Sequence, residues 1–334
     1  MELKDKHILL IALPGYCDGI LKKMEELGAD VDLIIDKPNE GFICKTFGRY
    51  KVGFYQKIIH NYYKEQLRSL KSKNYDYILA IRGEYTPIAT LKLLKLYYPN
   101  SQLILYMWDG LGNISTKGIE KKWPYYDKVY TFDRIDYEAN KNKLAFLPLY
   151  YYEDYLPKNI PEPNSDNFTY DLCFVGTGHD DRIRIISNVM QQCKKMGFRC
   201  FSYYFIPHYF VFFWYKLCNK NFNSVYLSDV KFKKMPFEKL YKTYANSKCI
   251  MDVESAGQHG LTMRSIEILG LKRKFITTNR DIANYDFYNK NNILILDRKN
   301  PVIDKEFFNK PYEYLDQEIY KKYSLKNWIL EIIK

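Results

Sequence analysis

The residues best suited to bind a charged ligand lie in one polar segment, residues 252–279, in the second half of the chain. Its pattern predicts a strand, a polar turn that contains Gly260, a helix that begins near Thr262, and another strand. Free backbone N–H groups and the dipole at a helix N-terminus favour a phosphate group. Thr262 can add a hydroxyl donor, Arg264 a charged fork of donors, and Glu267 an acceptor for ribose hydroxyls. The segment suits a nucleoside diphosphate, although an ordinary helix start with a surface arginine gives the same pattern.

A second Gly-rich turn follows a predicted strand at residues 172–175. It contains Gly176, Gly178, His179 and Arg182. It is not a dinucleotide-binding fingerprint, because Asp181 stands where the third glycine is required. His179 or Arg182 could reach a phosphate from this turn. Alternatively, Asp180 or Asp181 caps the following helix and His179 is only exposed, and the sequence leaves both interpretations open.

Three carboxylates in the first half of the chain could act as a general base towards a hydroxyl group. Each follows a strand-like run: Asp18 after Pro14-Gly15, Glu84 after Ile81-Arg82-Gly83, and Asp109 after Trp108. We favour Asp109, then Glu84, then Asp18. Each of them could instead cap a loop or pair with an arginine.

No metal site and no cofactor are predicted. The Asp30-Val-Asp32 pair precedes a predicted strand, which puts it at the wrong end of the sheet for metal-assisted chemistry, and no other cluster has ligand spacing. The seven cysteines are an odd number and include no Cys-x-x-Cys pair. This pattern indicates reduced, buried thiols in a cytoplasmic protein.

The order of the predicted elements indicates two α/β domains, for which 334 residues is a suitable length. In each half, short apolar runs alternate with helical spacing, which predicts a parallel sheet covered on both faces. The predicted strands are 7–13, 31–35, 75–81, 103–107 and 128–132, then 172–175, 199–204, 249–253, 274–277 and 293–296. We place the domains at 1–150 and 169–315, with a Pro-rich linker at 151–168 and a terminal helix within 316–334. Such sheets bind ligands beyond the carboxyl ends of their strands, where the candidate residues are expected.

The net charge of +12 favours an anionic partner. No nucleic-acid-binding motif is present, so we expect phosphorylated substrates and an anionic membrane surface rather than nucleic acid. The basic amphipathic helix predicted at 52–70 is either a solvated helix face or a membrane contact. The aromatic run 205–215 packs in the core or between domains, or rests at a bilayer interface. With no signal peptide and no apolar run of spanning length, we expect a cytoplasmic protein that is peripheral to the membrane.

The same segments resemble the donor-binding region of GT-B glycosyltransferases. Over about residues 75–300, the chain resembles a group of bacterial capsule and lipopolysaccharide glycosyltransferases. The shared blocks are Tyr106-Met-Trp-Asp109-Gly, Thr131-Phe-Asp133, Phe146-Leu-Pro-Leu149, Cys173-Phe-Val-Gly-Thr-Gly-His179, Gly260-Leu-Thr-Met-Arg-Ser-Ile-Glu267 and Ile276-Thr-Thr-Asn279. Glu267 aligns with the second glutamate of the family's donor motif, but His259 stands at the position of the first, so the contacts to the donor sugar are not carried over.

The resemblance implies an α/β protein of the GT-B fold, with two Rossmann-like domains facing each other across a cleft. The first domain would bind the acceptor, the second the nucleotide sugar, and the terminal helix would pack back on the first. The implied reaction is metal-independent transfer of a sugar from a nucleotide-diphosphate sugar to a growing, lipid-linked surface polysaccharide, with UDP-hexose and UDP-galactofuranose as candidate donors. Donor contacts would come from Gly176, His179, Arg182, His259, Gly260, Thr262, Arg264 and Glu267. The alternatives are a nucleotide-sugar epimerase of the same fold, a non-catalytic nucleotide-sugar-binding subunit of a capsule assembly complex, and a polyanion-binding protein.

Overall fold

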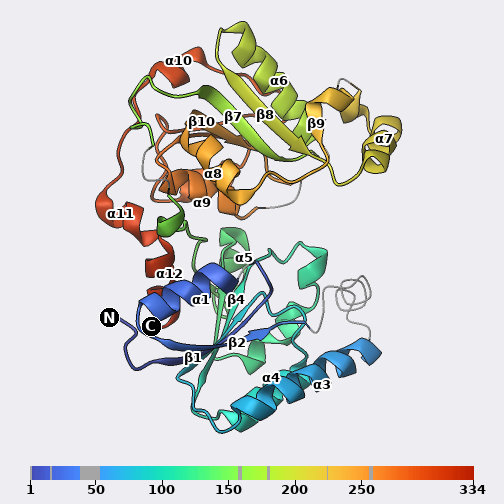
Figure 1. The fold of residues 1–334 in the computed structure, drawn as a ribbon, viewed down its shortest axis with the longest axis vertical. Coiled ribbons are helices and arrows are strands. Elements are labelled where there is room, and N and C mark those ends of the chain that lie inside the picture. Colours follow the sequence, from blue (N-terminus) through green and yellow to red (C-terminus); the bar gives the residue numbers. More distant parts are fainter. Residues whose placement is uncertain are drawn as a thin grey trace. The chain divides into compact units, whose positions relative to one another are not determined.

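The computed structural model describes residues 2–15, 17–37, 53–156, 160–178, 181–223, 225–255 and 259–334. The chain forms two compact α/β units (Figure 1). The first unit combines Met1–Pro148 with the terminal segment Leu325–Lys334, and the second consists of Leu149–Ser324. Each unit is built around one six-stranded sheet with parallel strand pairs, as the alternating pattern predicts.

The first sheet has the strand order β2-β1-β3-β4-β5-β6. Its strands are β1 His7–Ala12, β2 Asp30–Ile35, β3 Tyr77–Ile81, β4 Gln102–Met107, β5 Lys128–Thr131 and β6 Ala145–Phe146. The helices of this unit include α1 Cys17–Glu26, α3 Gly53–Leu70, α4 Ile88–Tyr97 and α5 Arg134–Ala139. The central strands are buried along nearly their whole length because helices cover both faces, which explains their continuous apolar sequence.

Helix α3 accounts for the amphipathic pattern at 52–70. Its buried residues recur every four positions, at Tyr55, Ile59, Tyr63 and Leu67. This spacing keeps one stripe of the helix against the core while the basic residues stay outside. On the exposed side, the chain also presents two apolar side chains, Phe54 and Ile58.

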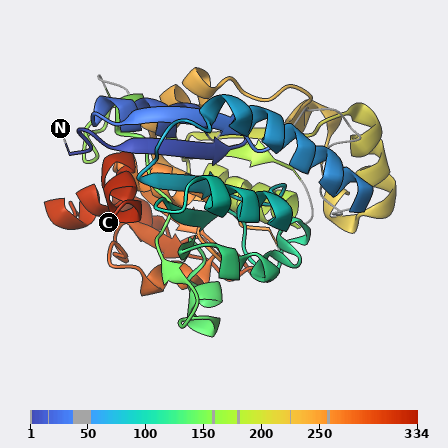
Figure 2. The same cartoon turned by 90° about the horizontal axis from the view of Figure 1, so that it is seen from below.

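The terminal helix α12, Leu325–Ile332, belongs to the first unit and packs beside α1 (Figures 1 and 2). The Trp328 ring lies edge-on to the Tyr106 ring of β4, with centroids 4.7 Å apart. Tyr130 donates a hydrogen bond to the carbonyl of Glu331 at 3.0 Å. The last ten residues thus complete a core that the first 148 residues leave open.

The second sheet has the strand order β12-β11-β10-β7-β8-β9. Its strands are β7 Tyr170–Thr177, β8 Cys200–Phe205, β9 Val230–Lys231, β10 Ser247–Asp252, β11 Lys274–Thr277 and β12 Ile293–Ile295. Its helices include α6 Arg182–Lys195, α7 Tyr209–Cys218, α8 Phe237–Ala245, α9 Met263–Gly270, α10 Lys305–Asn309 and α11 Gln317–Lys322. Helices α6, α8 and α9 pack against the central strands β7 and β10. The segments that carry the candidate donor residues follow the carboxyl ends of these two strands.

The Pro-rich stretch at 151–168 makes specific contacts within the second unit. The Tyr151 N–H donates to the carbonyl of Tyr323 at 2.8 Å. Asn164 exchanges hydrogen bonds with the backbone of Tyr312, and Arg273 donates to the carbonyl of Pro161 at 2.7 Å. These hydrogen bonds hold the described part of residues 151–168 against the rest of the second unit.

Candidate functional site

A pocket of about 250 Å³ opens in the second unit at the carboxyl edge of its sheet. Its lining residues are Arg182, Leu240, Tyr244, Asp252, Thr262, Met263, Arg264 and Glu267. They come from the start of α6, from α8, from the last residue of β10 and from the start of α9. Four of the residues selected from the sequence, Arg182, Thr262, Arg264 and Glu267, therefore meet in one place.

The side chain of Thr262 is the N-cap of α9 and accepts a hydrogen bond from the Ser265 N–H. Its hydroxyl donates to Oδ2 of Asp252 at 2.7 Å. A hydroxyl has one proton to donate, so in this arrangement the Thr262 donor is used by Asp252. The side chain organises the helix start, and the backbone N–H groups of α9 remain the donors at this end of the pocket.

Arg264 lies against the wall of the pocket and is paired with Oδ1 of the buried Asp252. Its Nε donates to the Tyr244 hydroxyl at 2.8 Å, and its guanidinium lies 5.7 Å from the centre of the Phe174 ring. A Cβ atom at Gly176 would approach Nη2 of Arg264 to 3.1 Å, so glycine at the end of β7 leaves room for the guanidinium.

Arg182 is the first residue of α6 and is buried, yet its Nε has no hydrogen-bond partner among the described residues. Burial lowers the pKa of its guanidinium, and the Asp252 carboxylate acts in the opposite direction. A buried cationic donor without an acceptor is costly. An anion in the pocket would supply the missing acceptor.

Glu267 accepts a hydrogen bond from the Tyr241 hydroxyl at 2.9 Å. Burial raises the pKa of the Glu267 carboxyl. The Tyr241 ring packs against Phe237, with centroids 4.5 Å apart, and Tyr155 packs edge-on to Phe237 at 5.0 Å. The sequence pattern does not identify these aromatic side chains as neighbours of Glu267.

Among the other donor residues selected from the sequence, Gly176, His259 and Gly260 are not in the lining of this pocket. His259 is exposed and Gly260 is buried, and both precede α9. The Asn279 amide donates to the carbonyl of His259 at 2.9 Å, which fastens this segment to the end of β11. Residues 179–180, and with them His179, lie outside the described part of the chain.

An ion-pair network that the sequence analysis missed joins the segments around the pocket. Arg298 donates to both oxygens of Asp181, at 2.9 and 2.7 Å, and to Oε1 of Glu254 at 2.8 Å. Thr278 donates to Oε2 of Glu254 at 2.6 Å. Asp181 is the N-cap residue of α6, but it uses its carboxylate on Arg298 and makes no side-chain capping bond, while the other capping candidate, Asp180, lies outside the described residues. The sequence signal that could have identified Arg298 is its position just after the last predicted strand, 293–296.

In the first unit, two of the three candidate bases lie together. Nη2 of Arg82 lies 2.7 Å from Oε1 of Glu84 and 2.6 Å from Oδ2 of Asp109, at the carboxyl ends of β3 and β4. Burial raises the pKa of the Glu84 carboxyl, and the guanidinium of Arg82 acts against this shift. Arg82 adopts a left-handed backbone with φ 71°, which is uncommon for a residue with a side chain. Asp18 is exposed on α1, where it accepts a hydrogen bond from the Cys17 thiol at 3.3 Å.

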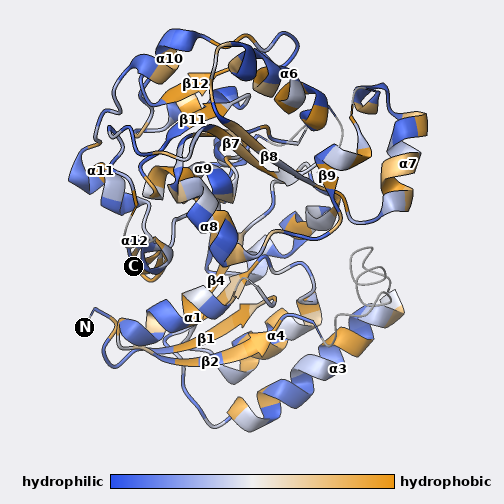
Figure 3. Cartoon of the chain, turned by 45° about the horizontal axis from the view of Figure 1, so that its top comes forward, coloured by the Kyte–Doolittle hydropathy of each residue, from blue (hydrophilic) through white to orange (hydrophobic). Residues whose placement is uncertain are grey.

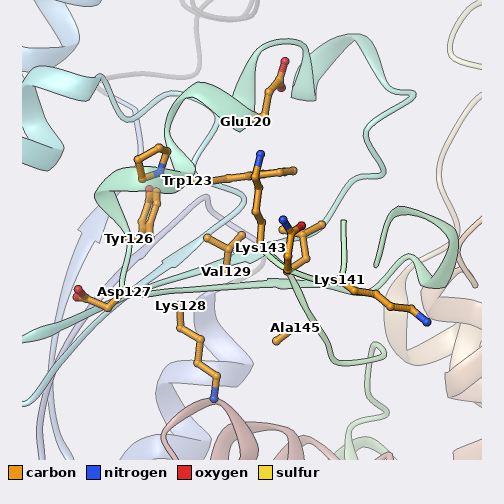
Figure 4. A pocket seen from close by; sticks show the side chains of 12 residues that line it. Glu120, Trp123, Tyr126, Asp127, Lys128, Val129, Lys141, Lys143 and Ala145 are labelled. Atoms are coloured by element: carbon orange, nitrogen blue, oxygen red, sulfur yellow. The ribbon is translucent and has the colours of Figure 1, made fainter. Parts of the chain in front are cut away.

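A larger hollow of about 410 Å³ lies at the amino ends of β5 and β6, where Trp123, Lys128 and Lys143 contribute to its lining (Figure 4). None of the residues selected from the sequence lines it. Among the described residues, no group of three His, Cys, Asp or Glu side chains could hold a metal ion. Asp30 and Asp32 lie at the amino end of β2, where Asp32 is paired with Lys73 at 2.7 Å. No helix in the described ranges is both long and apolar enough to cross a membrane.

Comparisons with known proteins give matches at the level of structure. No protein-family model and no curated protein sequence matches the chain. A glycosyltransferase from Rickettsia africae is similar over 99% of this chain and 98% of its own, with a TM-score of 0.58 and 12% identity. Anabaena HepE, solved in complex with UDP and glucose, is similar over 97% and 98%, with a TM-score of 0.60 and 9% identity. UDP-GlcNAc 2-epimerase from Methanocaldococcus jannaschii is similar over 98% and 99%, with a TM-score of 0.55 and 11% identity.

In each comparison the similarity covers nearly the whole length of both chains. At identities of 9% to 12% they establish the architecture rather than the chemistry. The chain has the two-domain GT-B fold, as the resemblance of its motifs implies.

Proposed function

We propose that this protein is a glycosyltransferase that binds a nucleotide-diphosphate sugar in the pocket of its second unit. Arg182 carries the proposal, because it is a buried guanidinium on the pocket wall whose Nε lacks an acceptor among the described residues. The start of α9 lies on the same pocket and offers backbone N–H groups. A diphosphate would satisfy both sets of donors at once.

The two arginines of the pocket have different roles in this proposal. Arg264 is paired with Asp252 and donates a hydrogen bond to the Tyr244 hydroxyl, so its main role is to shape the wall of the pocket. Its other guanidinium N–H groups would be additional donors to the diphosphate. Arg182 would supply positive charge and an Nε donor that has no acceptor among the described residues. As the bond to the sugar breaks, negative charge grows on the leaving diphosphate, and Arg182 with the N-terminus of α9 would stabilise it without a metal ion.

Glu267 and the aromatic residues beside it suit the nucleoside end of the donor. A carboxylate can accept hydrogen bonds from ribose hydroxyls, and Glu267 already accepts one from Tyr241. We propose UDP as the carrier, since structural neighbours include HepE in complex with UDP and glucose and an α-glucosyltransferase in complex with UDP. UDP-hexose and UDP-galactofuranose remain the proposed donors.

The first unit would bind and activate the acceptor. Asp109, with Glu84 beside it, is the proposed general base for an inverting transfer, and a retaining transfer would need none. The acceptor that we propose is a lipid-linked bacterial surface polysaccharide. One structural neighbour is the lipopolysaccharide outer core galactosyltransferase WaaB, similar over 98% of this chain with a TM-score of 0.55, which supports this class of acceptor.

Calorimetry with UDP, GDP, CDP and TDP, with and without Mg²⁺, tests the donor site. We expect one diphosphate to bind without metal, and Arg182→Gln to weaken it about 10- to 100-fold, as expected for lost hydrogen bonds to a charged group. Arg184→Gln is the matched control, because Arg184 lies two residues along α6 and binds Asn221 instead. Absence of binding by all four diphosphates, or equal binding by Arg182→Gln, would contradict the proposal.

A nucleotide-sugar epimerase is the second candidate, because two structural neighbours are UDP-GlcNAc 2-epimerases. An epimerase needs no acceptor. Incubation of the protein with each UDP-sugar alone, followed by chromatography of the nucleotide sugars, distinguishes the two activities. A new epimer would favour the epimerase, whereas sugar transfer that appears only with an acceptor glycan would favour the transferase.

A further inference from the structure

Helix α7 has one face in the core of the second unit and an apolar face exposed to solvent. Phe212 is buried, and Val211 and Tyr215 pack against the same core. The opposite stripe comprises Phe210, Phe213, Trp214 and Leu217, which are 77%, 54%, 65% and 85% exposed. These positions have the i, i+3, i+4, i+7 spacing of one helix face, and Figure 3 shows the hydrophobic character of α7. Core packing therefore explains only part of the aromatic run at 205–215.

Neighbouring segments extend this surface. Tyr209 packs edge-on against Phe232 with ring centroids 5.4 Å apart, and Lys216 lies 5.8 Å from the centre of the Tyr226 ring. Tyr226 and the adjacent Leu227 are both exposed. We use the name α7 patch for Tyr209, Phe210, Phe213, Trp214, Leu217, Tyr226 and Leu227.

The chain around the α7 patch is strongly basic. Residues 205–236 contain five lysines, Lys216, Lys220, Lys231, Lys233 and Lys234, and a single acidic residue, Asp229. All of these lysines except Lys216 are exposed, and Lys216 is half-buried. Asp229 accepts a hydrogen bond from the Tyr226 N–H, so it serves the local turn. The apolar stripe is thus accompanied by positive charge with almost no negative charge nearby in the sequence.

We propose that the α7 patch docks the protein on an anionic lipid bilayer. Trp and Tyr prefer the level of the headgroups, Phe and Leu can enter the acyl boundary, and lysines attract anionic lipid. With ten residues, α7 is too short to span a bilayer and would lie in its plane. Aromatic residues are also enriched at protein–protein interfaces, but lysine is depleted there, so the five lysines favour the lipid surface over a protein partner. This inference goes beyond the proposed sugar transfer and is tested without donor or acceptor.

Vesicle binding tests the proposal directly. We expect the wild-type protein to sediment with vesicles of phosphatidylcholine and phosphatidylglycerol in equal parts, to bind phosphatidylcholine alone weakly, and to dissociate at high salt. Trp214 provides a local probe, because it is exposed, whereas Trp123 and Trp328 are buried and Trp108, in the first unit, is only partly exposed. Its fluorescence should shift to shorter wavelength on binding and be quenched by brominated lipid, and Trp214→Phe should remove most of this signal.

Variants of exposed residues separate docking from folding. Phe210→Ser with Trp214→Ser should lower the partition coefficient at least about 10-fold, since two large apolar side chains no longer leave water. Lys220→Gln, Lys233→Gln and Lys234→Gln should each lower it about 5-fold, on anionic vesicles only. Leu96→Ser with Val302→Ser is the matched control, because these residues are 73% and 62% exposed outside the α7 patch. Circular dichroism and thermal melting confirm that each variant folds.

Three outcomes would overturn the proposal. The first is that the wild-type protein binds neither kind of vesicle. The second is that Phe210→Ser with Trp214→Ser binds as well as wild type. The third is that sedimentation equilibrium shows a dimer that these two substitutions dissociate, with no binding to lipid, in which case the α7 patch is covered by a second copy of the chain.

Discussion

The guanidinium of Arg264 is paired with the carboxylate of Asp252 on the wall of the pocket in the second unit. The sequence pattern predicts Arg264 as a direct ligand of phosphate. In the structure, however, its positive charge is already compensated before any ligand binds. The Asp252 side chain is buried and accepts from Thr262 as well. Asp252 therefore couples the end of β10 to the start of α9, and in the proposed function Arg182 rather than Arg264 is the main cationic ligand of the diphosphate.

The first prediction concerns this buried pair. Asp252→Asn should lower the free energy of unfolding by about 3 kcal/mol, because it leaves the Arg264 charge partly buried without its partner. A diphosphate would restore a negative charge beside Arg264. Saturating UDP should therefore raise the melting temperature of Asp252→Asn more than that of the wild-type protein, measured by scanning calorimetry.

The Arg280–Asp297 pair is the control for this experiment, with an N–O distance of 3.1 Å and both side chains largely exposed. Exposed pairs contribute less than about 1 kcal/mol, so Asp297→Asn should leave the melting temperature nearly unchanged. Equal effects of the two substitutions would show that Asp252 has no special role in the stability of the pocket.

Much of the fold could be predicted from the sequence, because the buried parallel strands are continuous apolar runs. The run predicted at 103–107 coincides with β4, and that at 274–277 coincides with β11. Short elements were missed, among them α5 at Arg134–Ala139, in which no residue is buried. Its start is fixed by hydrogen bonds from the Ile135 and Asp136 N–H groups to the Asp133 side chain rather than by an apolar stripe. Hydrophobic periodicity does not predict such an element.

The candidate site could be predicted only in part, because sequence patterns identify residues near strand ends but not their partners. Arg182, Thr262, Arg264 and Glu267 were selected in this way and line one pocket. The sequence shows Asp252 only as part of a strand. Its pairing with Arg264 depends on how α9 packs against the end of β10. The Arg298 network joins residues more than one hundred positions apart, a contact that only the fold creates.

The second prediction concerns the close approach of Gly270 to Tyr151. A Cβ atom at Gly270 would lie 2.5 Å from Cγ of the buried Tyr151 ring, and the Tyr320 hydroxyl also donates to the Gly270 carbonyl at 2.6 Å. Gly270→Ala should therefore force the ring to move and cost about 2 kcal/mol of stability in urea denaturation. Gly53→Ala is the control, since nothing lies within 4 Å of its Cβ position and alanine favours a helix. An unchanged urea midpoint for Gly270→Ala would mean that Tyr151 is not held as described.

The third prediction is a pH dependence of stability that originates at Lys274. This residue is buried at the start of β11, where its ammonium donates to the Phe307 carbonyl at 2.5 Å. Burial lowers its pKa from 10.5 to about 8. Between these values the unfolded chain holds more protons than the folded one, so the contribution of Lys274 to stability rises with pH, by about 1 kcal/mol per pH unit. Below about pH 8 both states are protonated and the cost of burying the charge is complete.

Urea denaturation at several pH values from about 7.5 to 9.5 checks this sign. The stability of wild type relative to Lys274→Met should increase as pH rises, because methionine has no proton to lose. Lys22→Met, at an exposed side chain of α1, should follow the wild-type pH profile. A difference between wild type and Lys274→Met that stays constant across this range would refute the assignment.

The last prediction separates the two carboxylates around Arg82. Asp109→Asn should reduce kcat about 10²- to 10⁴-fold, the usual contribution of a general base, while UDP should bind with unchanged affinity, because the pocket proposed for it is in the other unit. Glu84→Gln should have a smaller effect on kcat and a larger one on stability, since Glu84 is the more buried partner of Arg82. Glu25→Gln, at an exposed position of α1 that is not a candidate base, is the control and should keep full activity. If Glu84→Gln abolished transfer while Asp109→Asn did not, the base would be Glu84. If both variants kept wild-type kcat, neither would be the base, and Asp18→Asn would then decide between the third candidate base and a retaining transfer, which needs none.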